Sequence, residues 1–448
     1  MNYLRFLLKN CRFLSFGILV AFFSAFGQTF FIAVFGPDIR AEFDLSHGGF
    51  GGYYMIGTAA SGFILIWAGK LIDRFDLRWV TVGVSMALIL ACAFMAAVPA
   101  AWALALAIFA LRLSGQGLMS HTAITAMGRY FETERGRAVS VSILGFPLGV
   151  AVFPGLAVWL TGELGWRMAW GAIALALGVF LIPLLLWLLK GHSVRHQTFV
   201  AQTEGEAGAT VSQHRRRQWS RAEVLRDPRF YLICIAITAP SFITTGLFFH
   251  QAYLAAAKGW TMAWMASAFV AYTVGAIGSN LAFGPLIDRF GARHLLTYYL
   301  YPLVLTSLTI VCFDHPLSAI ALTLFMGLTS GSGQTLVGAA WPEFYGVLHL
   351  GAIRAMVIST SVGASALSPF ILGWLIDRGA TMEGIAVGFL VYLAVAIGGI
   401  MLAMALPVPT KKRACTDERL CQRKNSGDHQ GDCHDDCDQS PRGPQCPG

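Results

Sequence analysis

Charged residues are scarce in this sequence. Asp, Glu, Lys and Arg make up 12% of its 448 residues, against about 25% in ordinary soluble domains, and 56% of the residues are hydrophobic. A soluble chain of this size cannot cover its surface with so few charges. The composition therefore excludes a soluble globular protein and predicts a lipid-facing surface.

Signatures of several function classes are also missing. The nine Cys residues form no C-x-x-C pair, and His429, Cys433, His434 and Cys437 near the C-terminus have no standard ligand spacing, so we predict no redox motif, metal site or cofactor. The sequence has no H-E-x-x-H, no paired Asp box and no nucleophile elbow, so we predict no catalytic residue and no enzyme. It lacks a basic face with interleaved aromatic residues, which excludes nucleic acid as a partner.

Long hydrophobic runs are what the sequence does contain. A membrane-spanning helix needs about 20 apolar residues, and twelve runs of about this length can be counted. They cover residues 14–36, 48–70, 79–98, 102–127, 138–161, 167–189, 230–255, 262–285, 295–313, 317–341, 354–376 and 384–406. We therefore predict an all-α membrane protein with twelve transmembrane helices in two pseudo-symmetric six-helix bundles, residues 14–190 and 229–406.

The distribution of basic residues predicts the orientation. If the N-terminus is cytoplasmic, the inner segments hold 27 Lys and Arg residues, whereas the outer loops hold only Arg40, Arg167, Lys258 and Arg378. The positive-inside rule then places the N-terminal segment 1–13, the central loop 191–228 and the polar, disordered tail 407–448 in the cytoplasm. We expect a multi-pass protein of a bacterial inner membrane, surrounded by membrane lipid and monomeric.

The central loop contains two recognisable features. Ser220-Arg221-Ala222-Glu223 fits a capping box and predicts a short helix that ends before Pro228. The basic run His214–Arg217 either contacts anionic lipid headgroups or is a solvated positive-inside loop.

A ten-residue sequence occurs once in each half of the chain. Gly69-Lys-Leu-Ile-Asp73-Arg-Phe-Asp-Leu-Arg78 returns 215 residues later as Gly284-Pro-Leu-Ile-Asp288-Arg-Phe-Gly-Ala-Arg293, and seven positions are identical. The pattern G-x-L-x-D-R-x-G-x-R between apolar helices resembles the loop signature of the major facilitator superfamily of transporters. The first copy departs from the pattern at Asp76, where Gly is usual, and at Leu77, where a basic residue is frequent.

The resemblance implies a conformational gate at the inner face. The predicted gate residues are Gly69, Asp73, Arg74, Arg78, Gly284, Asp288, Arg289 and Arg293. In the family the Asp of each loop contacts the opposite half, which implies that Asp73 pairs with the start of helix 11 near Arg354 and Asp288 with the start of helix 5 near Arg137. A carboxylate at a helix N-terminus is stabilising by about 0.3–1 kcal/mol. We expect the two Gly residues to allow close backbone approach at a helix end.

Arg112 is the only charged residue deep inside a predicted span. Arg112-Leu-Ser-Gly-Gln116-Gly resembles a shortened form of the family's R-x-x-x-G-x-G pattern. A lipid-facing Arg at this depth would cost at least about 2.5–3.5 kcal/mol, so we predict that Arg112 faces the bundle interior or a wet cavity. It either contacts an anionic substrate, tunes proton coupling, or is a structural Arg bonded to helix-end carbonyls. Gln116 and Ser120 follow at i+4 and i+8 on the same helix face.

Polar side chains on four helices predict a cavity. In the superfamily helices 1, 4, 7 and 10 line the central cavity, and here these helices carry polar residues at helical spacing. Besides Ser24, they are Gln28, Arg112, Gln116, Ser241, Thr244, Thr245, Ser330 and Gln334, and we also predict His250 as a substrate-binding residue. The alternative is that these side chains only hydrogen-bond between helices.

No Asp or Glu falls inside a predicted span, which argues against both a buried carboxylate proton relay and a cationic substrate. His121 and His250 are the remaining titratable side chains that could bind a proton or substrate. We predict a secondary transporter that moves a small organic solute by alternating access, an organic anion such as a monocarboxylate, with protons as the coupling ion. One alternative is efflux of amphipathic compounds by proton antiport, although helix 5 has Phe153-Pro154-Gly155 in place of the antiporters' G-P-x-x-G-G. A non-transporting receptor or assembly factor on the same fold is a second alternative.

Overall fold

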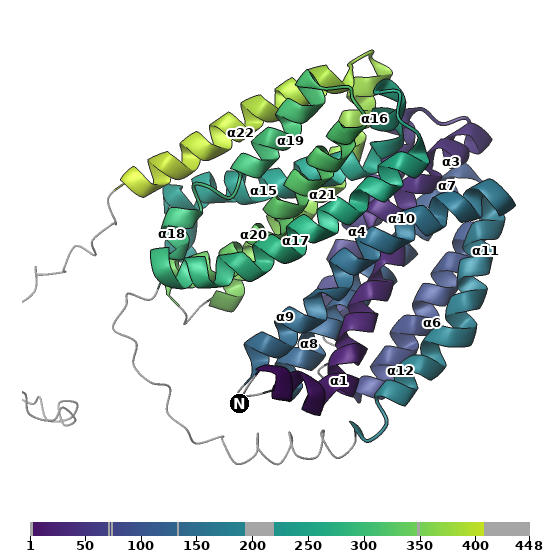
Figure 1. Cartoon of the computed structure of the whole chain (residues 1–448), viewed down its shortest axis with the longest axis horizontal. Coiled ribbons are helices and arrows are strands. Elements are labelled where there is room, and N and C mark those ends of the chain that lie inside the picture. The colour runs from purple at the N-terminus through teal and green to yellow at the C-terminus, as the bar shows by residue number, and fades with distance from the viewer. Residues whose placement is uncertain are drawn as a thin grey trace, which may run out of the picture. The chain divides into compact units, whose positions relative to one another are not determined.

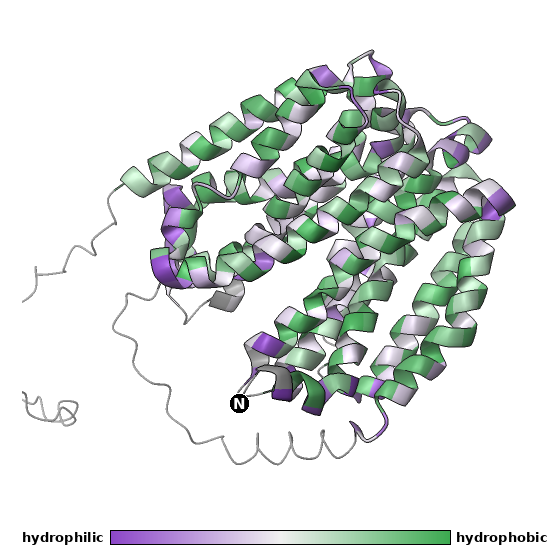
Figure 2. Ribbon diagram, in the orientation of Figure 1, coloured by the Kyte–Doolittle hydropathy of each residue, from purple (hydrophilic) through white to green (hydrophobic). Residues whose placement is uncertain are grey.

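The described part of the chain is built from helices. The computed structural model describes residues 3–69, 72, 75–131, 134–192, 219–346 and 350–406, and no strand occurs in these ranges. Eleven helices there are long and apolar enough to cross a membrane, and a shorter apolar helix, Tyr301–Cys312, lies where we predicted the span 295–313. The fold is thus all-α with twelve membrane helices (Figure 1), and apolar residues dominate the long helices (Figure 2).

The first half contains six spans, several of which are composite. Its elements are α1 (Tyr3–Phe23), the 3-10 turn η1 (Ser24–Gly27), α2 (Thr29–Ile32), the 3-10 turn η2 (Ala33–Phe35), α3 (Gly36–Phe43), α4 (His47–Ala68), α6 (Leu77–Ala96), α7 (Ala101–Leu111), the π-helix η3 (Arg112–Met119), α8 (Ser120–Tyr130), α9 (Arg135–Ile143), α10 (Gly145–Leu164), α11 (Trp166–Ala176), the π-helix η4 (Leu177–Leu181) and α12 (Ile182–Leu188). Helix 1 is therefore interrupted after Gly27, and helices 4 and 6 each contain a π-helical segment.

The second half repeats the six spans with longer unbroken helices. Its elements are α14 (Arg221–Leu225), α15 (Pro228–Phe249), α16 (Gln251–Ala257), α17 (Met262–Phe290), α18 (Ala292–Leu295), α19 (Tyr301–Cys312), α20 (Leu317–Tyr345), α21 (Leu350–Asp377) and α22 (Met382–Ala405). The capping box at Ser220 and Glu223 is confirmed, and α14 ends before Pro228 as expected. The run 214–217 and the tail 407–448 lie outside the described residues.

The largest difference from the predicted spans is at the start of the chain. We placed residues 1–13 before the first span, but α1 begins at Tyr3. Phe6 and Phe13 explain the difference, because both are buried against Phe131 with ring centroids 5.6 and 5.8 Å apart. Aromatic packing thus extends the helix beyond the apolar run that hydropathy detects.

Polar side chains mark where many helices begin. Ser46, Asp76, Asp227 and Thr261 each accept a hydrogen bond from a backbone N–H in the first turn of the helix that follows. Such caps satisfy N–H groups that have no partner within the helix. Asp76 therefore has a clear role at the position where the family pattern has Gly. In the second copy Gly291 takes a φ of +79°, a conformation that favours glycine.

The two halves pack against each other through exchanged helix pairs. Helix α4 of the first half packs on α21 of the second, and α17 of the second packs on α10 of the first. Counted as membrane spans in chain order, α4 and α21 are the second and eleventh spans, and α17 and α10 are the eighth and fifth. The second pair therefore repeats the first with the halves interchanged. Both halves belong to one compact unit, Met1–Ala405.

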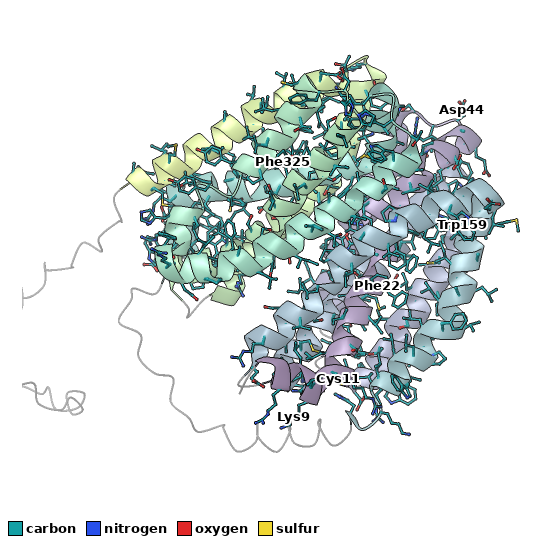
Figure 3. All side chains as sticks on the ribbon, viewed as in Figure 1. Lys9, Cys11, Phe22, Asp44, Trp159 and Phe325 are labelled. Carbon is teal, nitrogen blue, oxygen red and sulfur yellow. The ribbon has the colours of Figure 1, made fainter. Side chains whose placement is uncertain are left out.

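The membrane helices begin and stop at two opposite ends of this unit. The His47 end is the one where α4 begins and α21 stops, and the Gly69 end is the one where α4 stops and α21 begins. Lys9 lies near the start of α1 at the Gly69 end, whereas Asp44, which follows α3, lies at the His47 end (Figure 3).

Ionic clusters at the two ends hold helices of the same half together. At the His47 end, Arg167 pairs with Glu42 at 2.6 Å, and Lys258 pairs with Asp314 at 2.5 Å and Glu383 at 2.7 Å.

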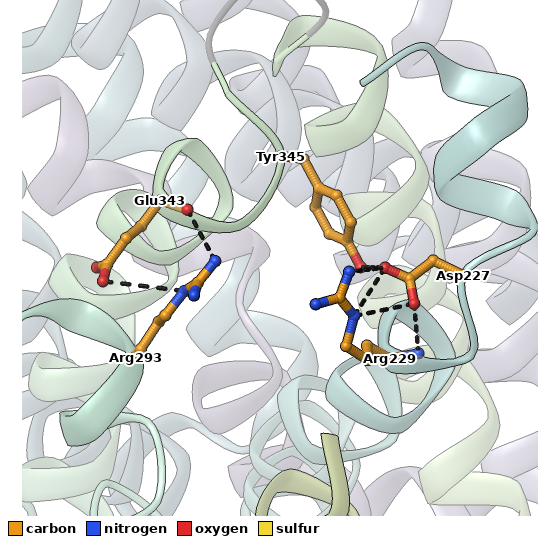
Figure 4. Close-up of polar contacts among 5 residues, drawn as sticks. All are labelled: Asp227, Arg229, Arg293, Glu343 and Tyr345. Atoms are coloured by element: carbon orange, nitrogen blue, oxygen red, sulfur yellow. Dashed lines mark hydrogen bonds and ion pairs between the residues drawn. The ribbon is translucent and has the colours of Figure 1, made fainter. Parts of the chain in front are cut away.

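At the Gly69 end, Asp227 accepts hydrogen bonds from Arg229 and from the Tyr345 hydroxyl, which lies 3.1 Å away (Figure 4). All three of these side chains are largely buried, so the cluster fixes the start of α15 against the end of α20.

Candidate functional site

One cavity of about 540 Å³ lies between the two halves. Eight of the nine predicted substrate-binding residues line it, namely Gln28, Arg112, Gln116, Ser241, Thr244, Thr245, Ser330 and Gln334. Their convergence shows that the polar stripes of helices 1, 4, 7 and 10 face a common space.

The wall from the first half depends on a close crossing of helices 1 and 4. A Cβ on Gly115 would lie 2.6 Å from the backbone N of Gly27 and 2.7 Å from its Cα, so only glycine allows this approach. Directly after the crossing the chain becomes extended at Gln28, with φ −92° and ψ 152°, before α2 begins. The interrupted helix brings the Gly27 carbonyl and the Thr29 hydroxyl next to Arg112.

Arg112 is buried, with 3% of its surface exposed. Its Nη1 donates two long hydrogen bonds, to Gly27 O at 3.4 Å and to Thr29 Oγ1 at 3.3 Å, while its Nε has no partner. The guanidinium carbon lies 5.3 Å from the centre of the Tyr54 ring, at a distance typical of cation–π contacts. Among the described residues no carboxylate forms an ion pair with Arg112, so the charge is held by neutral groups.

Residues of the π-helix η3 form the helix 4 part of the cavity wall. Arg112, Gln116 and Gly117 line the cavity, but Ser120 does not, although we placed it on the same face. Ser120 is the first residue of α8, directly after η3, and the cavity wall from this span ends before it.

The wall from the second half carries hydroxyl groups. Ser241, Thr244 and Thr245 form one stripe of α15 together with Pro240. Because Pro240 has no N–H, the carbonyl of Ala236 is free to accept a hydrogen bond from the Tyr299 hydroxyl at 2.9 Å. On α20, Ser330 accepts from the Tyr272 hydroxyl, also at 2.9 Å.

Several lining residues were missed at the sequence level. They are Thr29, Thr58, Ser61, Tyr272, Tyr299, Thr329, Ser361 and Ser365. Most lie on helices 2, 8, 9 and 11, whereas the prediction considered only helices 1, 4, 7 and 10. Thr58 and Ser61, at i and i+3 on α4, are a signal that could have been used.

Three residues suggested by the sequence lie outside the cavity. His250 does not line it; its Nε2 lies 3.0 Å from Pro369 O at the His47 end, because α15 stops at Phe249 and the chain turns there. Ser24 is buried and donates to Ala21 O at 2.6 Å, which is a structural bond within helix 1. The Nε2 of His121, a residue of α8, lies 3.2 Å from the Gly69 O at the end of α4.

The predicted gate residues that the structure describes lie apart from the cavity. Asp73 and Arg74 lie outside the described residues. Gly69 ends α4, and the Arg78 guanidinium lies 3.4 Å from Leu189 O. Gly284 contradicts its prediction: α17 continues to Phe290, so Gly284 lies inside a helix, and a Cβ there would meet no atom within 4 Å.

The second loop is held by α20 of its own half. Arg293 donates to the carbonyl O of Glu343 at 3.1 Å, and the Glu343 carboxylate accepts from the Ala292 N–H at 2.9 Å (Figure 4 shows the Arg293–Glu343 pair). The Arg289 guanidinium lies over the Phe290 ring. Among the described residues no hydrogen bond or ion pair joins Asp288 to the start of α9, so the predicted contact with helix 5 is not made in this structure.

The lining of the cavity combines one positive charge with neutral polar groups. Arg112 is the only formally charged side chain among its described lining residues; the other polar groups there are hydroxyls and amides. Within the described ranges no group of three or more His, Cys, Asp or Glu side chains could hold a metal ion. The chemistry available is hydrogen bonding around one fixed positive charge.

Comparisons with known proteins agree with this architecture. The model of the Major Facilitator Superfamily matches residues 17–345. Human monocarboxylate transporter 12 is 24% identical over 292 residues, a match that covers 59% of this chain and about half of the relative's length, 55%.

A solved structure is similar over nearly its whole length. It is a bacterial homologue of the human lysosomal transporter Spinster, in an inward-facing and occupied conformation. The TM-score is 0.61 with 13% identity, over 90% of this chain and 97% of that chain, and at this identity the likeness shows the fold alone. Since the family model covers most of the chain and the fold agrees, the protein belongs to the major facilitator superfamily of transporters.

Proposed function

We propose that this protein is a secondary transporter that carries a small organic anion, of the monocarboxylate class, by alternating access. The observation that carries the proposal is the environment of Arg112: a buried guanidinium that lines the cavity, has an unpartnered Nε and, among the described residues, has no paired carboxylate. Burying a charge without a counter-charge is costly. A substrate carboxylate in the cavity supplies the missing partner.

Two further observations support this substrate class. The described lining of the cavity contains no acidic side chain that would repel an anion, and its hydroxyl groups can bind oxygen atoms elsewhere on the solute. The relative at 24% identity is named as a monocarboxylate transporter. The volume of about 540 Å³ suits a small organic molecule and leaves room for water.

The test is uptake of radiolabelled monocarboxylates into proteoliposomes. A charge-assisted hydrogen bond contributes about 1.5–3 kcal/mol, so Arg112→Gln should lower uptake by roughly tenfold to a hundredfold, since 1.4 kcal/mol is tenfold. Arg112→Lys keeps the charge and should retain part of the activity. Arg12→Gln is the matched control, because Arg12 contacts Trp187 outside the cavity. Unchanged uptake by the Arg112→Gln protein would refute the anion site.

Orientation, coupling and gating form the second part of the proposal. The excess of basic residues in the segments at the Gly69 end supports a cytoplasmic location for that end and for both termini, in a bacterial inner membrane. We propose protons as the coupling ion, which predicts that an inward proton gradient accelerates uptake. At the cytoplasmic end, Asp73 and Asp288 remain our proposed contacts between the halves when that end closes.

A further inference from the structure

The first six residues of the loop sequence shared by the two halves occur a third time. Gly373-Trp-Leu-Ile-Asp377-Arg378 repeats the G-x-L-I-D-R of residues 69–74 and 284–289. The first copy begins directly after α4 at the Gly69 end and the second lies in the last turns of α17, whereas the third closes α21 at the His47 end. It therefore lies on the opposite side of the protein from the other two.

Asp377 of this third copy bonds to the other half. Its Oδ1 accepts a hydrogen bond from the His47 N–H at 2.9 Å, and its Oδ2 accepts from the Gly48 N–H at 2.8 Å. These are the first two N–H groups of α4, which have no partner within the helix. The Ser46 hydroxyl accepts from the Gly49 N–H, so the carboxylate completes the cap of a helix from the opposite half.

Glycine residues on both helices allow this contact. A Cβ on Gly373 would lie 2.5 Å from His47 O and 2.8 Å from the Gly48 N. A Cβ on Gly48 would in turn lie 2.8 Å from the Asp377 Oδ2. All three distances are far below ordinary van der Waals contact, so a larger side chain on either helix would separate α4 from α21 and withdraw the carboxylate.

Neighbouring contacts show that the halves are closed together at this end. The His47 ring lies 5.9 Å from the ring of His250 and 5.1 Å from that of Tyr253, and Phe50 stacks on Phe249 at 5.0 Å. The space left among these residues is only about 20 Å³, room for one water molecule. The bond to Asp377 thus lies at the rim of a tightly packed closure.

We propose that the third copy, Gly373–Arg378, is the outer latch of the transporter, and that Asp377 holds the two halves together whenever the cavity is closed to the outside. Opening to the outside moves α4 away from α21 and breaks the hydrogen bonds from the His47 and Gly48 N–H groups to the Asp377 carboxylate. The strength of this latch sets the ratio of inward-open to outward-open protein. The role as a gate rests on the proposed alternating access, but the contact itself does not depend on which substrate is carried.

The experiment measures access to the cavity from outside. Ile237, which lines the cavity, is replaced by Cys in a chain whose nine native Cys residues are changed to Ala. Right-side-out vesicles are treated with a membrane-impermeant maleimide, and the initial labelling rate is followed. Asp377→Asn should raise this rate about tenfold, which corresponds to 1.4 kcal/mol, and Gly373→Ala should raise it in the same direction.

A matched control separates the latch from a general charge effect. Asp314→Asn removes another carboxylate at the same end, one that pairs with Lys258 inside the second half, and should leave the rate within about twofold. A lower thermal midpoint with an unchanged labelling rate in both Asp377→Asn and Gly373→Ala would show a merely structural cap and overturn the proposal. Fast labelling already in the parent protein would count against it as well. Because labelling needs no substrate, a changed rate without carboxylate transport would refute the proposed substrate and leave the latch standing.

Discussion

The crossing of helices 1 and 4 offers a sharp test of how the cavity is built. Gly115→Ala adds one methyl group on η3, where the new Cβ would lie 2.6 Å from the Gly27 N and 2.7 Å from the Gly27 Cα. Both contacts involve backbone atoms, which cannot rotate away as a flexible side chain could. The two helices must therefore separate.

The size of the separation can be worked out from these distances. Ordinary contact begins at 3.4 Å, so the helices must part by at least about 0.8 Å at the Gly27 N. The bonds from Arg112 to Gly27 O and Thr29 Oγ1 are already 3.4 and 3.3 Å long, and the added distance breaks them. Overpacking of this kind costs about 1–3 kcal/mol. A misplacement of about 1 Å at a functional group can cost roughly a hundredfold in activity.

Two measurements on two variants decide the outcome. Gly115→Ala should lower the thermal midpoint in detergent and reduce carboxylate uptake by at least about tenfold. Gly128→Ala is the matched control in the same membrane helix, because a Cβ there meets no atom within 4 Å. Gly128→Ala should leave uptake unchanged. It should slightly raise stability, because glycine costs a helix about 1 kcal/mol relative to alanine. Full uptake by the Gly115→Ala protein would show that the crossing does not position Arg112.

Two other predictions concern charges at the ends of the helices. The side chain of Lys258 is 1% exposed; burial lowers its pKa, but the carboxylates of Asp314 and Glu383 outweigh this effect and raise it above the usual 10.5. These ion pairs stabilise the fold fully below about pH 10.5, and their contribution is lost as the pH rises through the folded-state pKa of Lys258. The thermal midpoint of the wild type should therefore fall at higher pH. Lys258→Met should be less stable by about 1–3 kcal/mol and should lack that alkaline step. Asp73→Asn should abolish transport without preventing folding, and a variant that retains full flux would argue against the inner gate inferred from the repeated loop.

Much of the architecture could be predicted because hydropathy and helical spacing are local properties. Twelve apolar runs predict twelve helices, and polar residues at i, i+3 and i+4 mark the faces that cannot meet lipid. For this reason eight of the nine predicted substrate-binding residues lie around one cavity. His250 does not line the cavity, because α15 ends at Phe249, a boundary that the hydropathy pattern could not show.

What the sequence by itself determined is an all-helical membrane protein with a buried Arg112 and a loop motif shared by its halves. Only the tertiary structure decided that Arg112 is held by Gly27 O, Thr29 and the Tyr54 ring rather than by a carboxylate, and that Asp377 caps a helix more than 300 residues away in sequence. The physical reason is that these contacts join helices from distant parts of the chain. Their distances depend on how closely two backbones approach at glycine residues. The sequence of one helix alone does not determine that approach.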